Sequence, residues 1–301
     1  MNESRPGRGF NIFWPRKGTA GDTVQWKRLG RRYFGQAEET LRRRESYCVS
    51  ACARFLNLAR FGDRIWGLWD SPGPLSALLI YGKQTIFPVF NGLEEVSLPR
   101  PIQRFLKGVP FHAVQGLQED VLLLEEALRG QGRKSIDPID YSLMALNRRP
   151  PAETLRSGPS GLIVRAPDPR ELETVLPLQT AYEREEVLPQ GANFNPAVCR
   201  MNLEHIFEAQ RILVAEWGGR IVAKANTSAF SFTRAQIGGV FVEPRCRGLG
   251  IGRRLCAALA ETLTAEGWGL SLFVKKRNHS ALAAYRAVGF KPIADYRISY
   301  Y

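Results

Sequence analysis

Cysteine and histidine are scarce in this chain. Its 301 residues include 5 cysteines and 3 histidines, and the cysteines are odd in number and scattered. This usage excludes a disulfide framework and indicates a reducing compartment, which we expect to be the cytoplasm. Cys48 and Cys52 are one helical turn apart, but no histidine or further cysteine completes a set of metal ligands. We therefore expect no metal site and interpret these two cysteines as small core residues.

Long apolar runs are also missing. No run approaches the roughly 20 residues that a membrane-spanning helix needs, so we expect no membrane partner. Residues 1–10 lack the apolar core of a signal peptide, and we interpret residues 1–25 as a flexible tail. The apolar content of 44% and the charged content of 24% are those of an ordinary globular protein, and the length allows two domains.

Acidic residues are too few to balance the basic ones. The chain has 42 Lys and Arg against 29 Asp and Glu, a net charge of +13. The excess is spread over both halves, with one local cluster of arginines at Arg28, Arg31, Arg32, Arg42, Arg43 and Arg44. Such a cluster would suit a nucleic acid, but no nucleic-acid-binding motif accompanies it. We favour solvated helix faces and keep a nucleic-acid-associated protein as a lesser hypothesis.

A segment rich in proline, glycine and serine divides the chain. It runs over residues 147–161 and has the composition of a linker. We therefore predict an N-terminal α/β domain over residues 26–147, a linker over residues 148–160 and a second domain over residues 161–301.

The most informative motif is the segment VFVEPRCRGLGIG at residues 240–252. Its alternating apolar residues predict a strand that leads into a glycine-rich turn and then directly into a helix. The N–H groups of such a turn and the positive end of the helix bind an anion such as a diphosphate. Arg247 adds a permanent positive charge. The glycine spacing fits neither the dinucleotide-binding fingerprint nor the P-loop of nucleotide triphosphatases.

A second motif follows after one predicted strand, at residues 270–274. It begins with Asn278, a good N-cap, and continues to Tyr285 and to Gly289-Phe290, where the glycine is a good helix stop. Taken alone, these residues would be structural. Their position after the anion cradle gives them functional weight.

With these two motifs, residues 162–301 resemble the GNAT superfamily of N-acetyltransferases. The family's acetyl-CoA motif is a strand, then Arg or Gln, two residues, Gly, one residue, and Gly or Ala. The resemblance implies an α/β fold with a mixed sheet and acetyl-CoA as the co-substrate. It implies cofactor contacts at Val240, Phe241, Val242, Arg247, Gly248, Leu249, Gly250, Ile251, Gly252, Asn278 and Tyr285.

The predicted elements of the second half fit this fold. They are a strand at 162–165, helices at 169–186 and 196–210, strands at 211–217, 220–231 and 236–242, a helix with an apolar stripe from Ile251 to Leu263, a strand at 270–274, a helix from Asn278, and a closing strand containing Tyr296, Ile298 and Tyr300. We expect Gly238 and Gly239 to form a bulge that lets their strand splay from its neighbour.

The first half has a similar but weaker order, which we interpret as a smaller, degenerate GNAT-like α/β domain. Its predicted elements are a helix at 37–57, strands at 64–69, 75–81, 85–90 and 111–115, a helix at 118–128 and a strand at 140–146. Residues 114–120 would stand where the cradle is, but Glu119 and Asp120 would repel a pyrophosphate. We expect this half not to bind CoA.

Acetyl transfer also needs a proton donor and a proton acceptor. The resemblance implies Tyr285 as the general acid for the departing thiolate, because a phenol pKa of about 10 lies above the thiol value of about 8.5. A packed aromatic is the alternative. The base stays open among several carboxylates or an ordered water; the carboxylates are Glu183, Glu185, Glu186, Glu216 and Glu243, and Glu243 is kept as a candidate site residue.

The leading hypothesis is an acetyl-CoA-dependent N-acetyltransferase that acts on an amine. The acceptor is open between protein, peptide and small-molecule amines. The N-terminal domain would shape the acceptor site or form a homodimer. The alternative is a non-catalytic acetyl-CoA sensor or scaffold, because no clear base is present.

Overall fold

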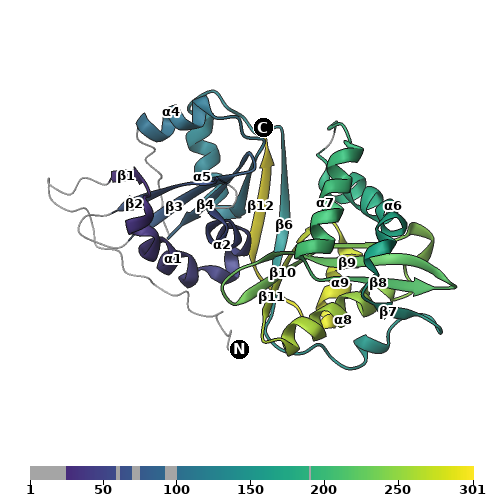
Figure 1. Ribbon diagram of the computed structural model, residues 1–301. Helices are drawn as coiled ribbons and strands as arrows, with labels where there is room; N and C mark the ends of the chain where they lie inside the picture. Colours follow the sequence, from purple (N-terminus) through teal and green to yellow (C-terminus); the bar gives the residue numbers. More distant parts are fainter. Residues whose placement is uncertain (1–24, 59–61, 70–74, 92–99, 190) are drawn as a thin grey trace, which may run out of the picture.

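The computed structural model describes residues 25–58, 62–69, 75–91, 100–189 and 191–301. These residues form a mixed α/β structure around one twelve-stranded sheet (Figure 1). The strand order is β1-β2-β3-β4-β5-β12-β6-β11-β10-β9-β8-β7. The predicted tail at residues 1–25 lies almost wholly outside the described residues.

The N-terminal half supplies the first six strands. Its elements are β1 (Gln25–Arg28), α1 (Phe34–Arg43), α2 (Val49–Leu56), β2 (Arg64–Trp69), β3 (Leu75–Gly82), β4 (Thr85–Phe90), α4 (Arg100–Gly108), β5 (Ala113–Leu117), α5 (Gln118–Arg129) and β6 (Asp137–Leu146). The prediction of one helix at residues 37–57 was wrong. A 3-10 turn at Glu45–Tyr47 separates α1 from α2 and turns the Glu45 carboxylate inward, where Ser231 and Thr233 donate hydrogen bonds to it. The elements β1 and α4 were not predicted.

The C-terminal half follows the predicted element order. Its elements are β7 (Ile163–Arg165), α6 (Leu172–Tyr182), α7 (Pro196–Ala209), β8 (Ile212–Trp217), β9 (Arg220–Phe230), β10 (Arg234–Val242), α8 (Ile251–Ala265), β11 (Gly269–Lys275), α9 (His279–Val288) and β12 (Lys291–Tyr300). A π-helical segment, Glu183–Val187, continues α6. The mixed α/β fold class is confirmed.

The two halves repeat one order of elements: strand, two helices, three strands, helix, strand, helix, strand. In this order β5 and α5 correspond to β11 and α9, so the counterpart of the cradle is the connection between β4 and α4. The placement of that counterpart at residues 114–120 was therefore wrong, because α4 was not expected. The connecting sequence, residues 91–99, has one glycine, two glutamates and no arginine.

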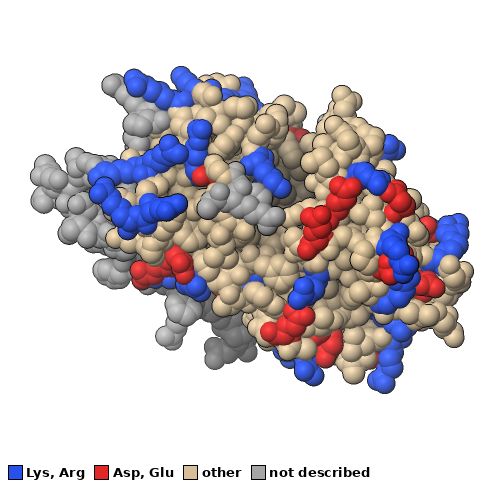
Figure 2. All heavy atoms as spheres, viewed as in Figure 1, with Lys and Arg blue, Asp and Glu red and all other residues tan. Residues whose placement is uncertain are grey.

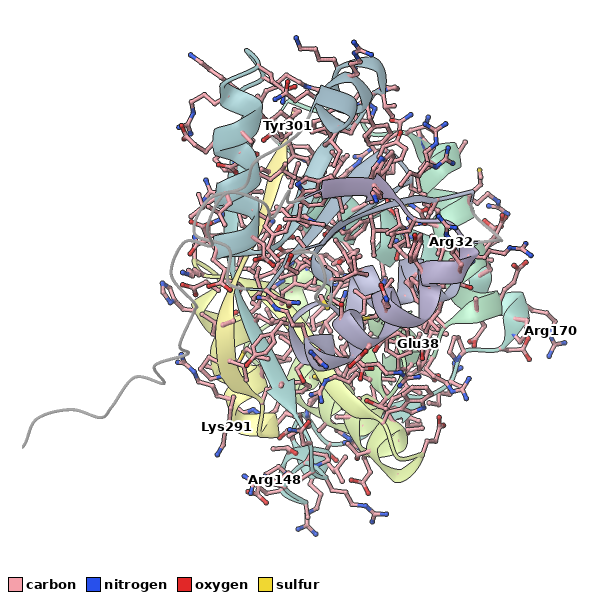
Figure 3. The ribbon with its side chains drawn as sticks, turned by 90° about the vertical axis from the view of Figure 1, so that its left-hand side faces the viewer. Arg32, Glu38, Arg148, Arg170, Lys291 and Tyr301 are labelled. Atoms are coloured by element: carbon pink, nitrogen blue, oxygen red, sulfur yellow. The ribbon has the colours of Figure 1, made fainter. Side chains whose placement is uncertain are left out.

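The halves exchange strands at the centre of the sheet. β12 lies between β5 and β6 and is antiparallel to both, while β6 pairs with β11. Figure 1 shows β6 and β12 side by side in the middle of the molecule, and Figure 3 shows β12 extending between the ends marked by Lys291 and Tyr301. The last strand of each half therefore lies against strands of the other half.

Helices cover both faces of this sheet. On one face, α1 and α2 pack over the N-terminal strands through residues such as Leu41 and Phe87, and α6 and α7 pack over the C-terminal strands through residues such as Val175 and Leu203. On the other face lie α4 and α5 in the first half and α8 in the second. The gap between the α1–α2 pair and the α6–α7 pair positions the site described below.

All five cysteines are free and buried. Cys48 and Cys52 are core residues, as predicted, with their sulfur atoms 3.7 Å apart. Within the described residues, no helix is long and apolar enough to cross a membrane. The cytoplasmic location stays a prediction.

Candidate functional site

A cavity of about 1460 Å³ lies where the two halves meet. Its floor is one face of the central strands, with Gln115 on β5, Ile298 on β12, Tyr141 on β6 and Lys275 on β11. Helix α2 forms one wall, and the end of α6 with α7 forms the other. Figure 2 shows the surface hollowed between the halves. Both halves therefore contribute side chains to a single site.

The cavity continues into an opening between β10 and β11. The two strands pair over Arg234–Gln236 and Gly269–Ser271 and then separate. On the other side of β10, the register with β9 shifts between Gly238 and Phe241, which confirms the predicted bulge. Gly239 has φ +59, and a Cβ there would lie 2.1 Å from the Asn226 side-chain oxygen. Only glycine fits this backbone and this close approach.

The predicted anion cradle lies at the end of this opening. After β10, a 3-10 turn at Pro244–Cys246 leads to Gly248 and Gly250, both with φ +79, and then to α8. Among the described residues no side chain caps the start of this 15-residue helix. Its first N–H groups are therefore available to an external anion. This geometry fits a diphosphate.

Arg247 stands at the mouth of the cradle and is held there by two contacts. Its Nε donates to the carbonyl of Val242 at 3.1 Å, and its Nη2 donates to the Glu185 carboxylate at 2.8 Å. The guanidinium also lies 5.3 Å from the ring centre of Phe241. An arriving diphosphate would therefore compete with Glu185 for this cation.

The π-helical segment Glu183–Val187 links the two motifs. Besides the contact of Glu185 with Arg247, Glu186 forms an ion pair with Lys275 at 3.0 Å and accepts a hydrogen bond from the Asn278 amide at 3.3 Å. The Asn278 oxygen caps α9 by accepting from the N–H of Ala281, as predicted. The acidic end of α6 thus lies beside the cradle and the start of α9.

Two tyrosines line the cavity near the bulge. Tyr285 on α9 packs edge-on against Phe290, and burial raises its pKa well above 10, so its phenol stays protonated but is a weaker acid than a free tyrosine. Tyr182 was not singled out from the sequence. Its hydroxyl accepts a hydrogen bond from the N–H of Gly239 at 3.3 Å, and burial raises its pKa to about 12. A tyrosine in a helix carries no local signal of such a role.

The candidate bases separate into two groups. Glu185 and Glu186 line the cavity, and so does His205 on α7, which sequence reasoning missed. Glu243 is not among the lining residues and faces Arg220 and Arg245, at 3.2 and 2.8 Å. This placement argues against its role as a base. Glu183 is buried against Gln179 and Asn202, and Glu216 pairs with Arg165.

Comparison with known proteins assigns most of the C-terminal half to a protein family. The sequence profile of the acetyltransferase (GNAT) family matches residues 178–290, which include both motifs. This region is a GNAT domain. The chain is 37% identical over 92 residues to the N-alpha-acetyltransferase RimI of Mycobacterium tuberculosis. That match covers 28% of this chain and 57% of RimI, so the chain spans little more than half the length of this curated relative.

Some solved structures resemble the whole two-half arrangement and not the GNAT domain alone. A Drosophila protein has a TM-score of 0.63 at 12% identity, covering 93% of this chain and 99% of its own. A tandem GNAT protein from the clavulanic acid biosynthesis pathway has a TM-score of 0.56 at 15% identity, covering 93% and 98%. At these identities the likeness shows the fold alone. The two-half arrangement is thus a fold that other proteins share.

The GNAT domain brings most of the predicted cofactor contacts to one cavity. The lining residues among them are Val240, Phe241, Val242, Arg247, Gly248, Gly250, Ile251, Gly252, Asn278 and Tyr285. Leu249 does not line the cavity and is 43% exposed.

The N-terminal half has its own opening, between β4 and β5. These strands pair at Thr85–Ile86 and then separate, as β10 and β11 do in the GNAT domain. Near the end of this opening, the buried Asp120 carboxylate accepts a hydrogen bond from the N–H of Phe90 at 3.2 Å and pairs with Arg44 at 3.4 Å. Burial raises the pKa of Asp120 to about 7. An ion pair therefore lies beside the last residue of β4, the strand that corresponds to β10 of the GNAT domain.

Three of the six arginines of the cluster in the first half form ion pairs. Arg42 and Arg43 bind Glu38 and Glu39 one turn earlier on α1, and Arg44 binds Glu119 at 3.0 Å as well as Asp120. Elsewhere the basic residues are dispersed: Figure 2 shows lysine and arginine spread over the face, and Figure 3 shows Arg148 and Arg170 pointing away from the molecule. The interpretation of this cluster as solvated helix faces rather than a nucleic-acid surface stays a prediction.

Proposed function

We propose that this protein is an acetyl-CoA-dependent N-acetyltransferase whose amine acceptor enters the cavity between the halves. The observation that carries the proposal is the continuous path from the cradle at Gly248–Gly252, through the opening between β10 and β11, to the space shared by both halves. A thioester carried in that opening would meet an amine that arrives from the other side.

The cradle would hold the diphosphate of the co-substrate. The N–H groups at Gly248, Gly250 and the start of α8 supply donors, and Arg247 supplies charge. The residues Val240–Val242 lie beyond the last pair between β10 and β11. Their backbone would pair with the pantetheine arm much as an added strand does.

The reaction would form a C–N bond and break a C–S bond. The amine nitrogen attacks the thioester carbonyl carbon and gives one proton to a base, while the departing sulfur takes a proton from the phenol of Tyr285. Solvent then returns a proton to the phenolate. Glu186, Glu185 and His205 line the cavity and would be the candidate proton acceptors, directly or through water. An α-amine, with a pKa of about 7.7–8.0, needs less help from a base than a lysine at about 10.4.

The acceptor class to test first is a protein α-amino group. RimI, to which the chain is 37% identical over 92 residues, carries the name N-alpha-acetyltransferase. Helix α2 and the floor strand β5 come from the N-terminal half, and the floor strand β12 is the strand exchanged between the halves. We expect these surfaces to select the acceptor.

Two measurements test the function. Calorimetry with CoA and acetyl-CoA should detect binding at the cradle, and release of free thiol should then be followed across peptides with free α-amines, lysine peptides, polyamines and amino sugars. Turnover that falls in Tyr285→Phe while CoA affinity stays constant supports the assigned proton donor. Binding without turnover on any acceptor would favour the sensor, and absence of binding would overturn the proposal.

A further inference from the structure

Lys224 is a lysine without access to solvent. It lies on β9, is 0% exposed and faces α6 beside the bulge of β10. Its Nζ donates to the Asn226 side-chain oxygen at 2.8 Å and to the carbonyl of Gly239 at 2.9 Å, and it lies 4.9 Å from the ring centre of Tyr182. A buried amine on a strand is costly, and an apolar residue of similar length would avoid that cost. The burial of Lys224 is therefore better explained by the groups that accept hydrogen bonds from its amine.

The surroundings of Lys224 include few titratable groups. Tyr182 faces it from α6, Glu183 from the π-helical segment and Cys199 from α7. Burial lowers the pKa of Lys224 to about 7, although Glu183 and Cys199 act in the opposite direction. The amine thus changes its charge within the working pH range.

The contact with Gly239 fixes one peptide group of the bulge. The carbonyl of Gly239 and the N–H of Val240 belong to the same planar trans peptide, so they point in opposite directions. The carbonyl is directed at Lys224 on β9. The N–H of Val240 is therefore directed away from β9, towards the side where β11 has separated, and Val240 lines the cavity there.

The same contact strengthens the N–H as a donor. A cation that binds a peptide carbonyl polarises the whole group, because linked hydrogen bonds reinforce one another. A preorganised donor aimed at a developing oxyanion lowers the barrier to acyl transfer. Lys224 would thus act on the reaction through a peptide, without touching the reacting atoms.

We propose that Lys224 is a positioning residue that holds the Gly239 peptide so that the N–H of Val240 polarises the carbonyl of the bound thioester. This inference rests on the proposed function, because it requires a thioester in the opening. It assigns a role to a buried side chain that lines no part of the cavity.

The test is an infrared measurement on acetyl-CoA labelled with ¹³C at the carbonyl and bound to the full chain. Binding should shift the carbonyl band to lower wavenumber in the wild type, and the shift should be smaller in Lys224→Met. Lys224→Gln, which keeps a donor without the charge, should give an intermediate shift. Lys291→Met, at an exposed position, is the control. Where turnover is measurable, it should fall about tenfold in Lys224→Met with little change in CoA affinity.

A second measurement needs no variant that might misfold. In the wild type, the shifted band should move back towards its free position as the pH rises through about 7, because the amine loses its charge. A band that is pH-independent, or one unchanged in a folded Lys224→Met that binds acetyl-CoA, would overturn this inference alone. Wild-type protein that binds no acetyl-CoA would overturn it together with the proposed function.

Discussion

The carboxylate of Glu45 accepts a hydrogen bond from the backbone N–H of Thr233 at 2.6 Å, although 188 positions separate the two residues. The hydroxyls of Ser231 and Thr233 donate to the same carboxylate. A turn of the N-terminal half thus binds the hairpin between β9 and β10 of the GNAT domain. Burial raises the pKa of Glu45, but these hydrogen bonds and Arg234 outweigh it and lower the pKa below 4.5.

We expect Glu45→Gln to lower the free energy of unfolding by about 1–3 kcal/mol at neutral pH, since it removes charge-assisted hydrogen bonds at a buried site. A lowered carboxyl pKa stabilises the fold above the unfolded-state value, and this stabilisation is lost as the pH falls through the folded-state value. Urea unfolding should therefore show the difference at pH 7 and a smaller one below about pH 4.5. Equal stability of the wild type and Glu45→Gln at pH 7 would contradict this prediction. Glu39→Gln, on the surface of α1, is the control.

Gly239→Ala should impair the protein far more than Gly238→Ala. A Cβ at Gly239 would lie 2.1 Å from the Asn226 oxygen and 2.9 Å from Nζ of Lys224, at φ +59, whereas a Cβ at Gly238 meets Ser228 at 3.2 Å with φ outside the left-handed region. The first substitution should lower the melting temperature and acetyl transfer together. Both variants should be compared by thermal unfolding and thiol release; similar effects would mean that the bulge is not constrained as described.

Opposite changes in CoA affinity are expected at the two ends of the Arg247–Glu185 ion pair. Arg247→Gln removes a cation from the mouth of the cradle and should weaken binding about tenfold, the size of one hydrogen bond between charged groups. Glu185→Gln removes the internal competitor and should tighten binding. Calorimetry with CoA at low salt measures both.

Arg245→Gln is the matched control for these variants, because Arg245 lies in the same turn, pairs with Glu243 and does not line the cavity. If Glu185→Gln weakened binding, the competition between carboxylate and diphosphate would be disproved.

Lys224 should make stability depend on pH in an unusual direction. Its folded-state pKa of about 7 lies below the model-peptide value of 10.5, so between these values the unfolded chain binds more protons, and stability rises with pH. The wild type should therefore gain stability relative to Lys224→Met between about pH 7 and about pH 10. Thermal unfolding across this range measures the difference; a parallel pH dependence of the two proteins would argue that the lysine keeps its ordinary pKa.

The sequence predicted the features that depend on neighbours along the chain. The cradle at residues 247–252 is recognisable because glycine spacing, a preceding strand and a following helix are all local. The cap at Asn278 and the bulge at Gly238-Gly239 are local as well. These signals were sufficient to find the cradle, the start of α9 and the bulge beside the opening between β10 and β11.

Features that depend on distant pairing were missed. Nothing in the residues of β12 distinguishes a strand that closes its own half from one that lies between β5 and β6. In the sequence, Lys224 is indistinguishable from an ordinary polar residue of a strand. It is buried because α6 and the bulge of β10 pack against it in the folded protein. The helix α4 went unnoticed because it is short and carries few apolar residues.

The exchange of β6 and β12 also constrains how the chain can be made. Residues 291–300 supply the neighbour of β5, so the middle of the sheet stays open until these residues, which follow the other eleven strands along the chain, have left the ribosome. Until then β5 and β6 each present an unpaired edge that can bind a wrong partner. A fragment cut at the linker would keep an unpaired strand edge permanently. We therefore expect the pair of halves, rather than either one, to be the smallest unit that folds.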